Sequence, residues 1–590
     1  MGSTTLQGLP ASPGIAVGRC WTVDRRKVRT PRRKVHPDEV EAELARLEAA
    51  LELSVHQLDG VRAKMEASEG AEHVAIIGVH RAMLRDPSLV DEVRRLVREE
   101  RVNVEWAVKR AIRKIKGAFD PDDEFFRERR SDVDYVGERI VKNLLGQGVD
   151  VAELPPHGSV VVARDLSPAD TALLFHDGKV AGLVTDAGGI TSHTAIVARA
   201  LEIPAVVGAG RASAAAERGD WIVVDGGRGL VVINPSAGER ADYEAARIRH
   251  LEAEAELARL KDLPAETVDG VCIGMFGNIE FGEEVPGLLS HGGEGVGLYR
   301  TEFLYMGKNA LPSEEDHYRD YTRILEAMGG RPVTVRTFDL GGDKLPSGQR
   351  DHSENPALGL RAVRYCLRHP DLFRAQLRAA VRAAANGNLR LMFPMVSGVA
   401  EVRAAKRMLI EAHEEVAAQG LPGRMPPVGI MVELPSAAVV ADRLAEEVDF
   451  LSIGTNDLIQ YTIGVDRQNK DVAYLYRPLH LAVLRTLRAI TDAAHRAGKP
   501  VAMCGEMAGE PLYTLVLLGL GLDELSMNGP SIPIVKRVIR SASAREGREL
   551  LDRLLQLTTA DDIEREVRGE MTRRFPGMLE GAAAVGPVSG

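Results

Sequence analysis

The C-terminal half of this 590-residue chain repeats one short pattern. After Leu263, short apolar runs alternate with amphipathic sequence of the helical type, such as LFRAQLRAAVRAA. The eight apolar runs are, in order, VCIGMFGN, GVGLYR, RPVTVRTFD, LRLMFPM, VGIMVE, DFLSIG, KPVAMCGE and DELSMN. Eight strands that are each followed by a helix are typical of a (β/α)8 barrel, and a length of about 310 residues lies within the range of that fold. We therefore predict a barrel domain over residues 265–580.

Polar and charged residues stand at the ends of these predicted strands. The active site of such a barrel lies at the carboxyl ends of its strands, so residues there converge in space although the sequence separates them. These positions hold Asn278, Arg300, Arg336, Glu433, Asn456, Asp457 and Cys504, and Arg467 follows in the next loop. Arginine forks bind phosphate and carboxylate oxygens, and two carboxylates together with substrate oxygens commonly hold Mg²⁺. The set predicts a site for a small phosphorylated acid and a divalent cation.

Each of these residues also has a structural explanation of its own. A strand-end carboxylate often pairs with a neighbouring arginine instead of binding a metal. Arg467 can equally be a surface arginine of its loop. A lone cysteine in an apolar strand, such as Cys504, is usually a small buried hydrophobic residue, whereas at a barrel mouth it can serve as an acid or a nucleophile. Their joint occurrence favours the binding site.

The N-terminal part of the chain has strand patterns on both sides of a helical segment. Residues 5–23 predict a strand or two. From Asp38 to about Leu145, apolar residues recur three and four positions apart, which indicates helices that form a scaffold or a partner surface. Strand-like runs then return as SVVVA, VAGLVTDA, AVVGA, WIVVD and LVVIN. We therefore predict an α/β domain with an inserted helical bundle, followed by a charged helical linker or a solvated surface helix. The predicted bounds are 1–35 and 148–236 for the α/β domain, 36–147 for the bundle and 237–264 for the linker.

His193 stands in the most distinctive stretch of the chain, VTDAGGITSHTAIVARALEIPAVVG. A strand over residues 180–185 leads to two glycines, and Thr191 or Ser192 then caps a helix. The histidine is thereby predicted at or near a helix N-terminus, where free backbone N–H groups and the helix dipole favour an anion. A neutral imidazole nitrogen there can attack phosphorus, and the helix N-terminus would stabilise the resulting phosphoimidazole. Without that chemistry, the same residues form only a good helix start.

Composition excludes several classes of protein. A net charge of −10 and an aromatic content of 4% argue against nucleic-acid binding by the chain as a whole, and we interpret the one basic stretch, residues 25–34, as a solvated connector. The four cysteines lie far apart without CxxC spacing, which argues against a disulfide framework or a zinc site. No apolar run approaches the roughly 18 residues of a membrane span, and the N-terminus lacks the positive region of a signal peptide. We expect a cytoplasmic protein without nucleic-acid or membrane partners.

Together these motifs resemble enzyme I of the phosphoenolpyruvate-dependent sugar phosphotransferase system, the phosphoenolpyruvate–protein phosphotransferase family. The resemblance extends from PASPGIA, which begins at Pro10, to the last barrel strand. GGITSHTAIVAR, with His193, looks like the family's phosphohistidine motif. GVGLYRTEFLYM at residues 295–306 and DFLSIGTNDLIQY at residues 449–461 look like its phosphoenolpyruvate-binding signatures. The first motif alone is less specific, because pyruvate phosphate dikinase and phosphoenolpyruvate synthase carry a similar one.

The resemblance implies an enzyme, and a role for each matching residue. His193 would accept the phosphoryl group of phosphoenolpyruvate and pass it to a histidine of the phosphocarrier HPr, with release of pyruvate as the first step of the system. Cys504 would donate a proton to the enolate. The substrate would be bound by Arg300, Arg336, Asn456, Asp457 and Arg467, and Mg²⁺ by Glu433 and Asp457.

The resemblance also implies an architecture, and the chain departs from the family in small ways. The phosphohistidine domain would swivel, HPr would dock on the helical bundle, and two chains would form a homodimer through the barrel. Ile190 stands where these enzymes often have arginine, and residues 25–34 belong to no motif of the family.

Three alternative functions share part of this pattern. An ATP-using dikinase or synthase would share the histidine and the barrel, but the chain has no GxxxxGK[ST] loop, and residues 36–147 are too helical and too short for an ATP-grasp domain. A binding protein with an inactive barrel would lack catalytic residues, yet His193, Glu433, Asp457 and Cys504 are all present. A regulatory paralogue would usually carry an extra sensory domain before the PASPGIA segment. This chain begins directly at that segment, so we expect the sugar system.

Overall fold

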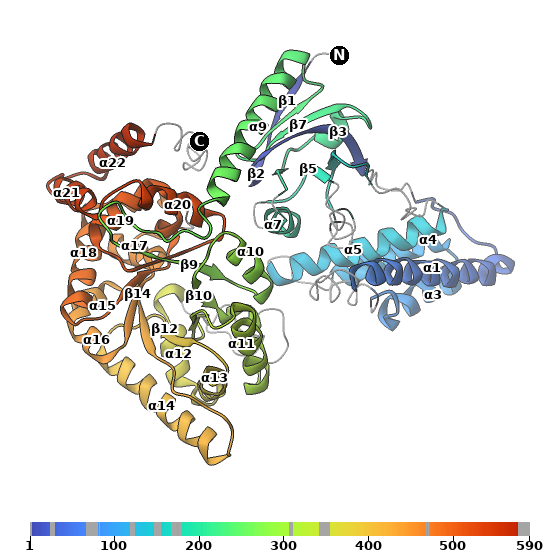
Figure 1. Ribbon diagram of the computed structural model, residues 1–590. Helices are drawn as coiled ribbons and strands as arrows, with labels where there is room; N and C mark the ends of the chain where they lie inside the picture. Colours follow the sequence, from blue (N-terminus) through green and yellow to red (C-terminus); the bar gives the residue numbers. More distant parts are fainter. Residues whose placement is uncertain are drawn as a thin grey trace. The chain divides into compact units, whose positions relative to one another are not determined.

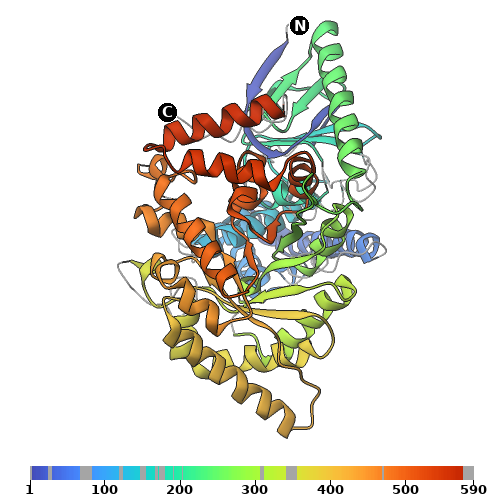
Figure 2. The same cartoon turned by 60° about the vertical axis from the view of Figure 1, so that its left-hand side comes forward.

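The computed structural model describes residues 3–23, 30–66, 81, 83–117, 124–146, 155–166, 171, 174, 180–189, 192–201, 203–305, 311–340, 355–467, 469 and 471–575. The chain forms two compact units, residues 1–252 and 253–590 (Figures 1 and 2). Within the described residues, no helix is both long and apolar enough to span a bilayer.

The second unit contains a closed barrel of eight parallel strands (Figure 1). The strands are β9 (Gly274–Ile279), β10 (Gly295–Arg300), β11 (Val333–Arg336), β12 (Leu389–Phe393), β13 (Val428–Val432), β14 (Phe450–Ile453), β15 (Val501–Met503) and β16 (Glu524–Met527). They follow one another around the barrel in sequence order, and β16 pairs with β9 to close it. Each strand falls within or overlaps one of the eight apolar runs, in the same order, so the predicted (β/α)8 barrel is confirmed.

Helices follow the strands and bury their apolar faces against the barrel wall. They are α10 (Val285–Ser290), α11 (Glu314–Met328), α12 (Ala362–Arg368), α13 (Pro370–Ala384), α14 (Val399–Ala418), α15 (Pro435–Val439), α16 (Ala441–Glu447), α17 (Thr455–Ile463), α18 (Leu481–Arg496), α19 (Thr514–Leu520), α20 (Ser531–Arg540), α21 (Ala544–Leu554) and α22 (Ala560–Arg574). Short 3₁₀ turns accompany them: η2 (Gly282–Glu284), η3 (Thr301–Leu304), η5 (Pro356–Leu358), η6 (Ala473–Leu475), η7 (Glu506–Gly509) and η8 (Pro511–Tyr513). In α18, for example, Val483, Leu487 and Ile490 are buried at helical spacing.

The barrel interior is filled by side chains. Leu298, Met392, Met431, Phe450 and Cys504 form an apolar cluster of their own. The Phe450 ring packs directly on the backbone of β13, where a Cβ at Gly429 would lie only 2.3 Å from the ring. A strand glycine of this kind marks a close approach between a side chain and a neighbouring backbone. Cys504, directly after β15, is therefore held among apolar neighbours inside the barrel.

The first unit contains an eight-stranded sheet in the order β1-β8-β7-β3-β4-β5-β6-β2. The strands are β1 (Thr4–Gln7), β2 (Leu9–Ser12), β3 (Ile15–Val23), β4 (Ser159–Ala163), β5 (Val180–Thr185), β6 (Ala205–Val207), β7 (Trp221–Asp225) and β8 (Leu230–Ile233). Strands β3 to β6 run parallel, whereas β1, β2, β7 and β8 pair antiparallel with their neighbours. N-terminal and later strands thus share one sheet, and the chain between β3 and β4 interrupts it, which confirms the predicted α/β fold with an inserted helical segment.

Both faces of this sheet are covered. Along β4, Val160 and Val162 belong to one apolar cluster with α8 (Ala212–Ala215), and Val161 and Ala163 belong to another with α7 (His193–Ala200). This alternation follows from the period of two along a strand. Helix α7 is fixed to β2, because Arg199 donates from Nε to the carbonyl oxygen of Ala11 at 3.0 Å.

The inserted segment forms its own helical core. Its helices are η1 (Pro37–Glu39), α1 (Val40–Glu66), α3 (Pro87–Glu100), α4 (Val104–Gly117) and α5 (Glu124–Leu144), and their apolar faces meet in one cluster. The buried carboxylate of Glu43 accepts a hydrogen bond from the Val104 backbone nitrogen at 2.8 Å, at the start of α4. Arg33 and Arg46 lie 2.7 and 2.9 Å from the other oxygen of Glu43.

Arg33 belongs to the basic stretch 25–34, of which residues 25–29 lie outside the described part. Besides its pair with Glu43, Arg33 lies 3.3 Å from Glu39. Lys34 forms a β-bridge with Val102 and donates to the Glu100 carbonyl oxygen at 2.8 Å. The described end of the stretch is exposed, as expected of a solvated connector, and these contacts also tie it to the helices.

Helix α9 (Ala237–Ala258) covers most of the predicted linker, and the two ends of this segment are held differently. Near its start, Arg240 stacks on the Trp221 ring with 4.4 Å to the centroid. Beyond its end, two cations of α20 hold the chain: Lys536 donates to the Lys261 carbonyl oxygen at 3.0 Å, and Arg540 donates to the Pro264 carbonyl oxygen at 2.6 Å.

Candidate active site at the carboxyl ends of the barrel strands

The centre of the candidate site is a buried arginine at the end of β11. Arg336 lies 3.1 Å from a carboxylate oxygen of Glu302 and 2.9 Å from one of Asp339. Only 12% of its side chain is exposed, and the two acids expose 8% and 3%. Burial with two carboxylates is tolerable because each charge has an opposite charge beside it. The Nε atom of Arg336 and the Oε1 atom of Glu302 are buried without a hydrogen-bond partner.

A second arginine, Arg361, completes this cluster and was not predicted. It stands at the start of α12, and its Nη2 lies 2.9 Å from Asp339 and 3.8 Å from Asp457. No strand end or periodic pattern marks its position in the sequence. Arg361 thus connects two predicted features, the Arg336 cluster and Asp457, through an acid that sequence reasoning also missed.

Glu433 follows β13 and is 1% exposed. Its Oε1 accepts a hydrogen bond from the Met395 backbone nitrogen at 2.6 Å. Burial, together with the neighbouring charges of Asp339 and Asp457, raises the pKa of Glu433 well above the usual value of a glutamate. Glu433 therefore lies near two other carboxylates, Asp339 and Asp457, and the cations Arg336 and Arg361 offset part of the negative charge.

Asn456 and Arg467 are brought together by Glu506, another residue that the sequence did not point to. Glu506 Oε1 accepts from Asn456 Nδ2 at 2.9 Å and lies 3.3 Å from Arg467 Nη1. Its backbone nitrogen donates to Asn456 Oδ1 at 2.9 Å. The loop arginine is therefore oriented toward Asn456 at the first turn of α17. Arg300, at the end of β10, pairs instead with Glu280 at 2.7 Å.

Cys504 is held from two sides. Ser452 donates from Oγ to the Cys504 sulfur at 3.2 Å, and Asn278 donates from Nδ2 to the Cys504 carbonyl oxygen at 3.0 Å. Asn278 is itself fixed by the hydroxyl of Ser526 at 2.6 Å. Burial raises the pKa of the Cys504 thiol, although the hydrogen bond from Ser452 opposes that shift. The neutral thiol is thus the stable form, which suits a proton donor better than a nucleophile.

The four thiols should therefore differ in reactivity toward iodoacetamide at neutral pH. Only Cys272 is exposed, and burial raises the pKa of the other three, to about 12 for Cys20. Because the thiolate is the form that reacts, we expect rapid alkylation of Cys272 and protection of Cys504 in the native chain. Peptide mass spectrometry after timed alkylation measures this. Equal labelling of Cys504 and Cys272 would contradict the buried position, and labelling in urea serves as the positive control.

His193 is the first residue of α7. The side chain of Ser192 accepts a hydrogen bond from the Ala195 backbone nitrogen at 3.3 Å and so caps this helix, as one of the two predicted candidates. Gly188, in the turn that precedes it, has a φ of +102°, which favours glycine. Ile190, Thr191 and the His193 side chain lie outside the described part of the structure. His193 belongs to the first unit, whereas the arginine and carboxylate cluster belongs to the second.

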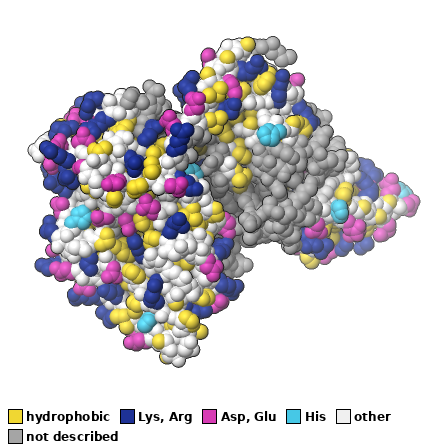
Figure 3. All heavy atoms as spheres, in the orientation of Figure 1, with side chains coloured by type: hydrophobic (Ala, Val, Ile, Leu, Met, Phe, Trp, Pro, Cys, Tyr) yellow, Lys and Arg dark blue, Asp and Glu magenta, His cyan; other side chains and the backbone are white. Residues whose placement is uncertain are grey.

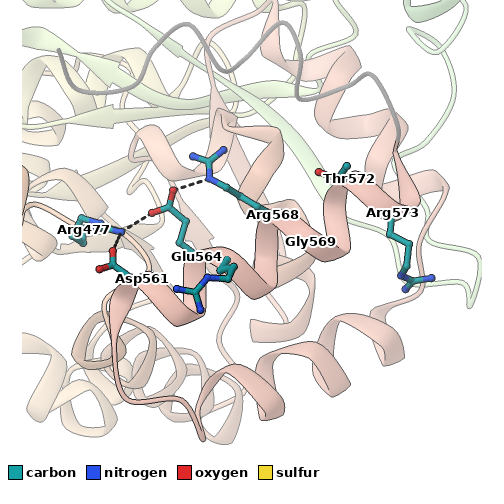
Figure 4. Close-up of a pocket in the computed structure, with 8 residues that line it drawn as sticks. Arg477, Asp561, Glu564, Arg568, Gly569, Thr572 and Arg573 are labelled. Carbon is teal, nitrogen blue, oxygen red and sulfur yellow. Dashed lines mark hydrogen bonds and ion pairs between the residues drawn. The ribbon is translucent and has the colours of Figure 1, made fainter. Parts of the chain in front are cut away.

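A surface groove runs along α22, and none of the residues that line it is one of the predicted site residues (Figure 4). It is lined by Arg477, Asp561, Glu564, Arg565, Arg568, Gly569, Thr572 and Arg573. Arg477 lies 2.8 Å from both Asp561 and Glu564, and Glu564 also accepts from Arg568. In Figure 3, basic side chains in blue and acidic side chains in magenta are interspersed over the surface that is drawn in colour. These ion pairs hold α22 against Arg477. The neighbouring residue, Tyr476, donates a hydrogen bond from its hydroxyl to the Asn456 carbonyl oxygen at 3.3 Å.

Three family models match the chain. The model described as "PEP-utilising enzyme, PEP-binding domain" matches residues 254–544. The model "PEP-utilising enzyme, mobile domain" matches residues 155–229, and the model "PEP-utilising enzyme, N-terminal" matches residues 7–129. The phosphoenolpyruvate-protein phosphotransferase of Geobacillus stearothermophilus is 44% identical over 95% of this chain and 97% of its own length. The chain belongs to the phosphoenolpyruvate-protein phosphotransferase family. The resemblance to enzyme I found in the sequence is thereby confirmed.

Other members of the family match over the same extent. The phosphoenolpyruvate-protein phosphotransferase of Bacillus subtilis is 41% identical over 95% of this chain and 98% of its own length. A solved structure described as "NMR solution structure of Enzyme I (nEIt) protein" is 37% identical and covers 42% of this chain and 99% of that chain, with a TM-score of 0.38.

Proposed function

We propose that this chain transfers the phosphoryl group of phosphoenolpyruvate to its own His193 and then to a histidine of the phosphocarrier HPr, releasing pyruvate. This is the first step of a sugar phosphotransferase system. Membership of the phosphoenolpyruvate-protein phosphotransferase family, over nearly the full length of the relatives, is the observation that carries the proposal. The cluster of arginines and carboxylates at the barrel mouth supports it independently.

The arginines supply the charge that phosphoenolpyruvate requires. Phosphate and carboxylate groups are bound bidentately by guanidinium forks, and Arg300, Arg336 and Arg467 stand at or beyond strand ends with Asn456 and Asp457. The pairs of Arg300 with Glu280 and of Arg467 with Glu506 are partly exposed, so a trianionic substrate can take the place of these carboxylates. Fixed cations also stabilise the charge on the phosphoryl group during transfer.

Mg²⁺ fits the acidic side of the same site. The described residues contain no group of three or more His, Cys, Asp or Glu arranged as a complete metal site. Two carboxylates, Glu433 and Asp457, are nevertheless what a Mg²⁺ site that is completed by substrate oxygens and water needs. The raised pKa of Glu433 supports this fit, because a cation would relieve the repulsion from Asp339 and Asp457. When bound, Mg²⁺ would neutralise charge on the substrate phosphate.

The remaining chemistry falls to His193 and Cys504. The imidazole nitrogen of His193 attacks phosphorus, the bond between phosphorus and the enol oxygen breaks, and the enolate of pyruvate is left. The Cys504 thiol then gives its proton to C3 of the enolate, which yields pyruvate and a thiolate. Ser452 donates a hydrogen bond to that sulfur and can stabilise the thiolate until it regains a proton.

This assignment gives each domain a separate role in the reaction. We propose residues 1–35 and 148–236 as the swivelling phosphohistidine domain, residues 36–147 as the surface for HPr, residues 237–264 as the linker and residues 265–580 as the phosphoenolpyruvate-binding barrel. His193 and the barrel site belong to different units, and the proposed swivelling would carry His193 between the barrel site and HPr. A homodimer through the barrel and a cytoplasmic location complete the proposal, and four free cysteines suit a reducing compartment.

Labelling of the unaltered chain tests the function. The chain is incubated with ³²P-phosphoenolpyruvate and Mg²⁺ without any nucleotide, and protein-bound label and pyruvate are measured. We expect acid-labile, base-stable label with one pyruvate per label, transfer of the label to added HPr, and loss of labelling when EDTA removes Mg²⁺. Labelling only after addition of ATP would instead indicate a dikinase or synthase, and no label under either condition would indicate a binding protein.

A further inference from the structure

A network of buried hydrogen bonds lies behind the arginine and carboxylate cluster, and Gln376 of α13 stands at its centre. The side chain of Gln376 is fully buried. Its Oε1 accepts from the Phe338 backbone nitrogen at 3.0 Å. Its Nε2 donates to the hydroxyl oxygens of Thr301 at 3.2 Å and Tyr321 at 3.1 Å. A polar residue without exposure would be costly here if these bonds were not made.

The direction of the hydrogen bonds follows from one backbone group. The N–H of Phe338 can only donate, so it must face the oxygen of the Gln376 amide. The amide NH₂ group then donates to Thr301, whose own hydroxyl donates onward to the Arg336 carbonyl oxygen at 3.0 Å. Two positions of the segment after β11, Arg336 and Phe338, are therefore held by the same glutamine, one of them through Thr301.

The other branch continues into a buried histidine. Tyr321 accepts from Gln376, so its hydroxyl hydrogen is directed to Nδ1 of His317, at 3.1 Å. His317 then carries its proton on Nε2, which lies 3.1 Å from the Tyr305 hydroxyl. This branch reaches from α11 to the residue that follows η3. The short segments that bear Arg300 and Arg336 are thus both tied to α11 and α13.

The geometry points to Gln376 as a positioning residue for the substrate arginine Arg336, an inference that rests on the proposed function. Thr301 stands between Arg300 and Glu302, and its hydroxyl fixes the Arg336 backbone, so the ion pair of Glu302 with Arg336 depends on this contact. Phe338 precedes Asp339, the other partner of Arg336. Satisfied buried networks of this kind rigidify the groups that they join. Gln376 does not touch the substrate, and its effect passes through the backbone of residues 301 and 336–338.

The variant that isolates this role is Gln376→Met. Methionine has a similar length and volume but leaves Phe338, Thr301 and Tyr321 without their shared partner. Because the hydrogen bonds that fix the Arg336 backbone would be lost, and one polar contact fewer typically weakens an interaction about 10-fold, we expect phosphoenolpyruvate to bind about 10-fold more weakly. The limiting rate of self-phosphorylation should change far less than the affinity, since the nucleophile is untouched. A neutral glutamic acid at this position keeps the oxygen that accepts from Phe338 and has one hydrogen to donate. Gln376→Glu should therefore lose less affinity for phosphoenolpyruvate than Gln376→Met.

Thr491→Val provides the matched control. Thr491 of α18 is also buried, and its hydroxyl donates only within its own helix, to the Leu487 carbonyl oxygen at 3.0 Å. Binding of phosphoenolpyruvate to each full-length chain is measured by calorimetry, and its melting temperature is measured alongside. Weaker binding by Gln376→Met than by Thr491→Val at a comparable melting temperature is the expected result. Equal binding by these two variants overturns the positioning role, whereas failure of the unaltered chain to bind phosphoenolpyruvate overturns the proposed function and the inference with it.

Discussion

A His193→Ala variant is expected to take up no phosphoryl group from phosphoenolpyruvate and to release no pyruvate. Alanine has no nitrogen lone pair, so the bond to phosphorus cannot form and the substrate has no acceptor. The substitution should leave the helix intact, because Ser192 still caps α7 and alanine is the best helix former. Substrate binding should also persist, since the arginine and carboxylate cluster belongs to the other unit. Labelling, pyruvate release and calorimetric binding on the same preparation measure all three expectations.

His413→Ala is the matched control for this result. His413 lies on α14, outside the residues assigned to the site, and its variant should be labelled like the unaltered chain. A His193→Ala chain that still acquires acid-labile label would show that another histidine is the acceptor, and the peptide that carries the label would identify it.

Replacing Arg336 with methionine is expected both to destabilise the chain and to abolish binding of phosphoenolpyruvate. The change leaves the carboxylates of Glu302 and Asp339 buried without their shared cation, although Arg361 still contacts Asp339. Removing one partner of a buried ion pair typically costs about 3–5 kcal/mol in the free energy of unfolding. Binding is lost because a guanidinium fork that would face the phosphate is removed. Urea unfolding followed by circular dichroism measures the first effect, and calorimetry measures the second.

An exposed ion pair offers the comparison for Arg336→Met. Arg545 and Glu549 are paired at 3.0 Å on α21, and both side chains are more than half exposed. An Arg545→Met variant should change the free energy of unfolding by less than about 1 kcal/mol and leave binding unaltered. A double variant, Arg336→Met with Glu302→Gln, should recover part of the lost stability but none of the binding. Equal stability of the two single arginine variants would contradict the burial argument.

Strand positions and helix caps could be predicted from the sequence because they depend on neighbours along the chain. Each barrel strand, such as β13, is a short apolar run bounded by polar and helical sequence, and this pattern is local. The placement of His193 at a helix N-terminus likewise rests on glycines and a hydroxyl within five residues. Because the strands close into a barrel, their carboxyl ends lie at one end of it. Arg336 and Asp457 are joined there through Asp339 and Arg361, and the charge of Asp457 acts on buried Glu433. Arg300 and Arg467 instead face acids of their own.

The partners of these residues could not be predicted in the same way. Arg361 follows a connection after β11, and no periodic pattern shows how that chain returns to Asp339 and Asp457. Glu506 joins Asn456 to Arg467 from beyond the end of the next strand, β15. Gln376 appears in the sequence as an ordinary polar residue of an amphipathic helix, yet it is fully buried. A polar residue in a helix is normally interpreted as exposed, and only the tertiary packing reveals a buried network.

The order of the elements, the eight barrel strands and the residues at their ends follow from local sequence patterns, because hydrophobic period, capping and turn chemistry act over a few residues. Which charges are buried together, and which atoms hold them, depends on how the folded chain brings distant segments together. Asn278 and Cys504, for example, are 226 positions apart and meet through one hydrogen bond. Such contacts depend on loop paths and on the balance between desolvation and pairing, and both are properties of the folded chain as a whole.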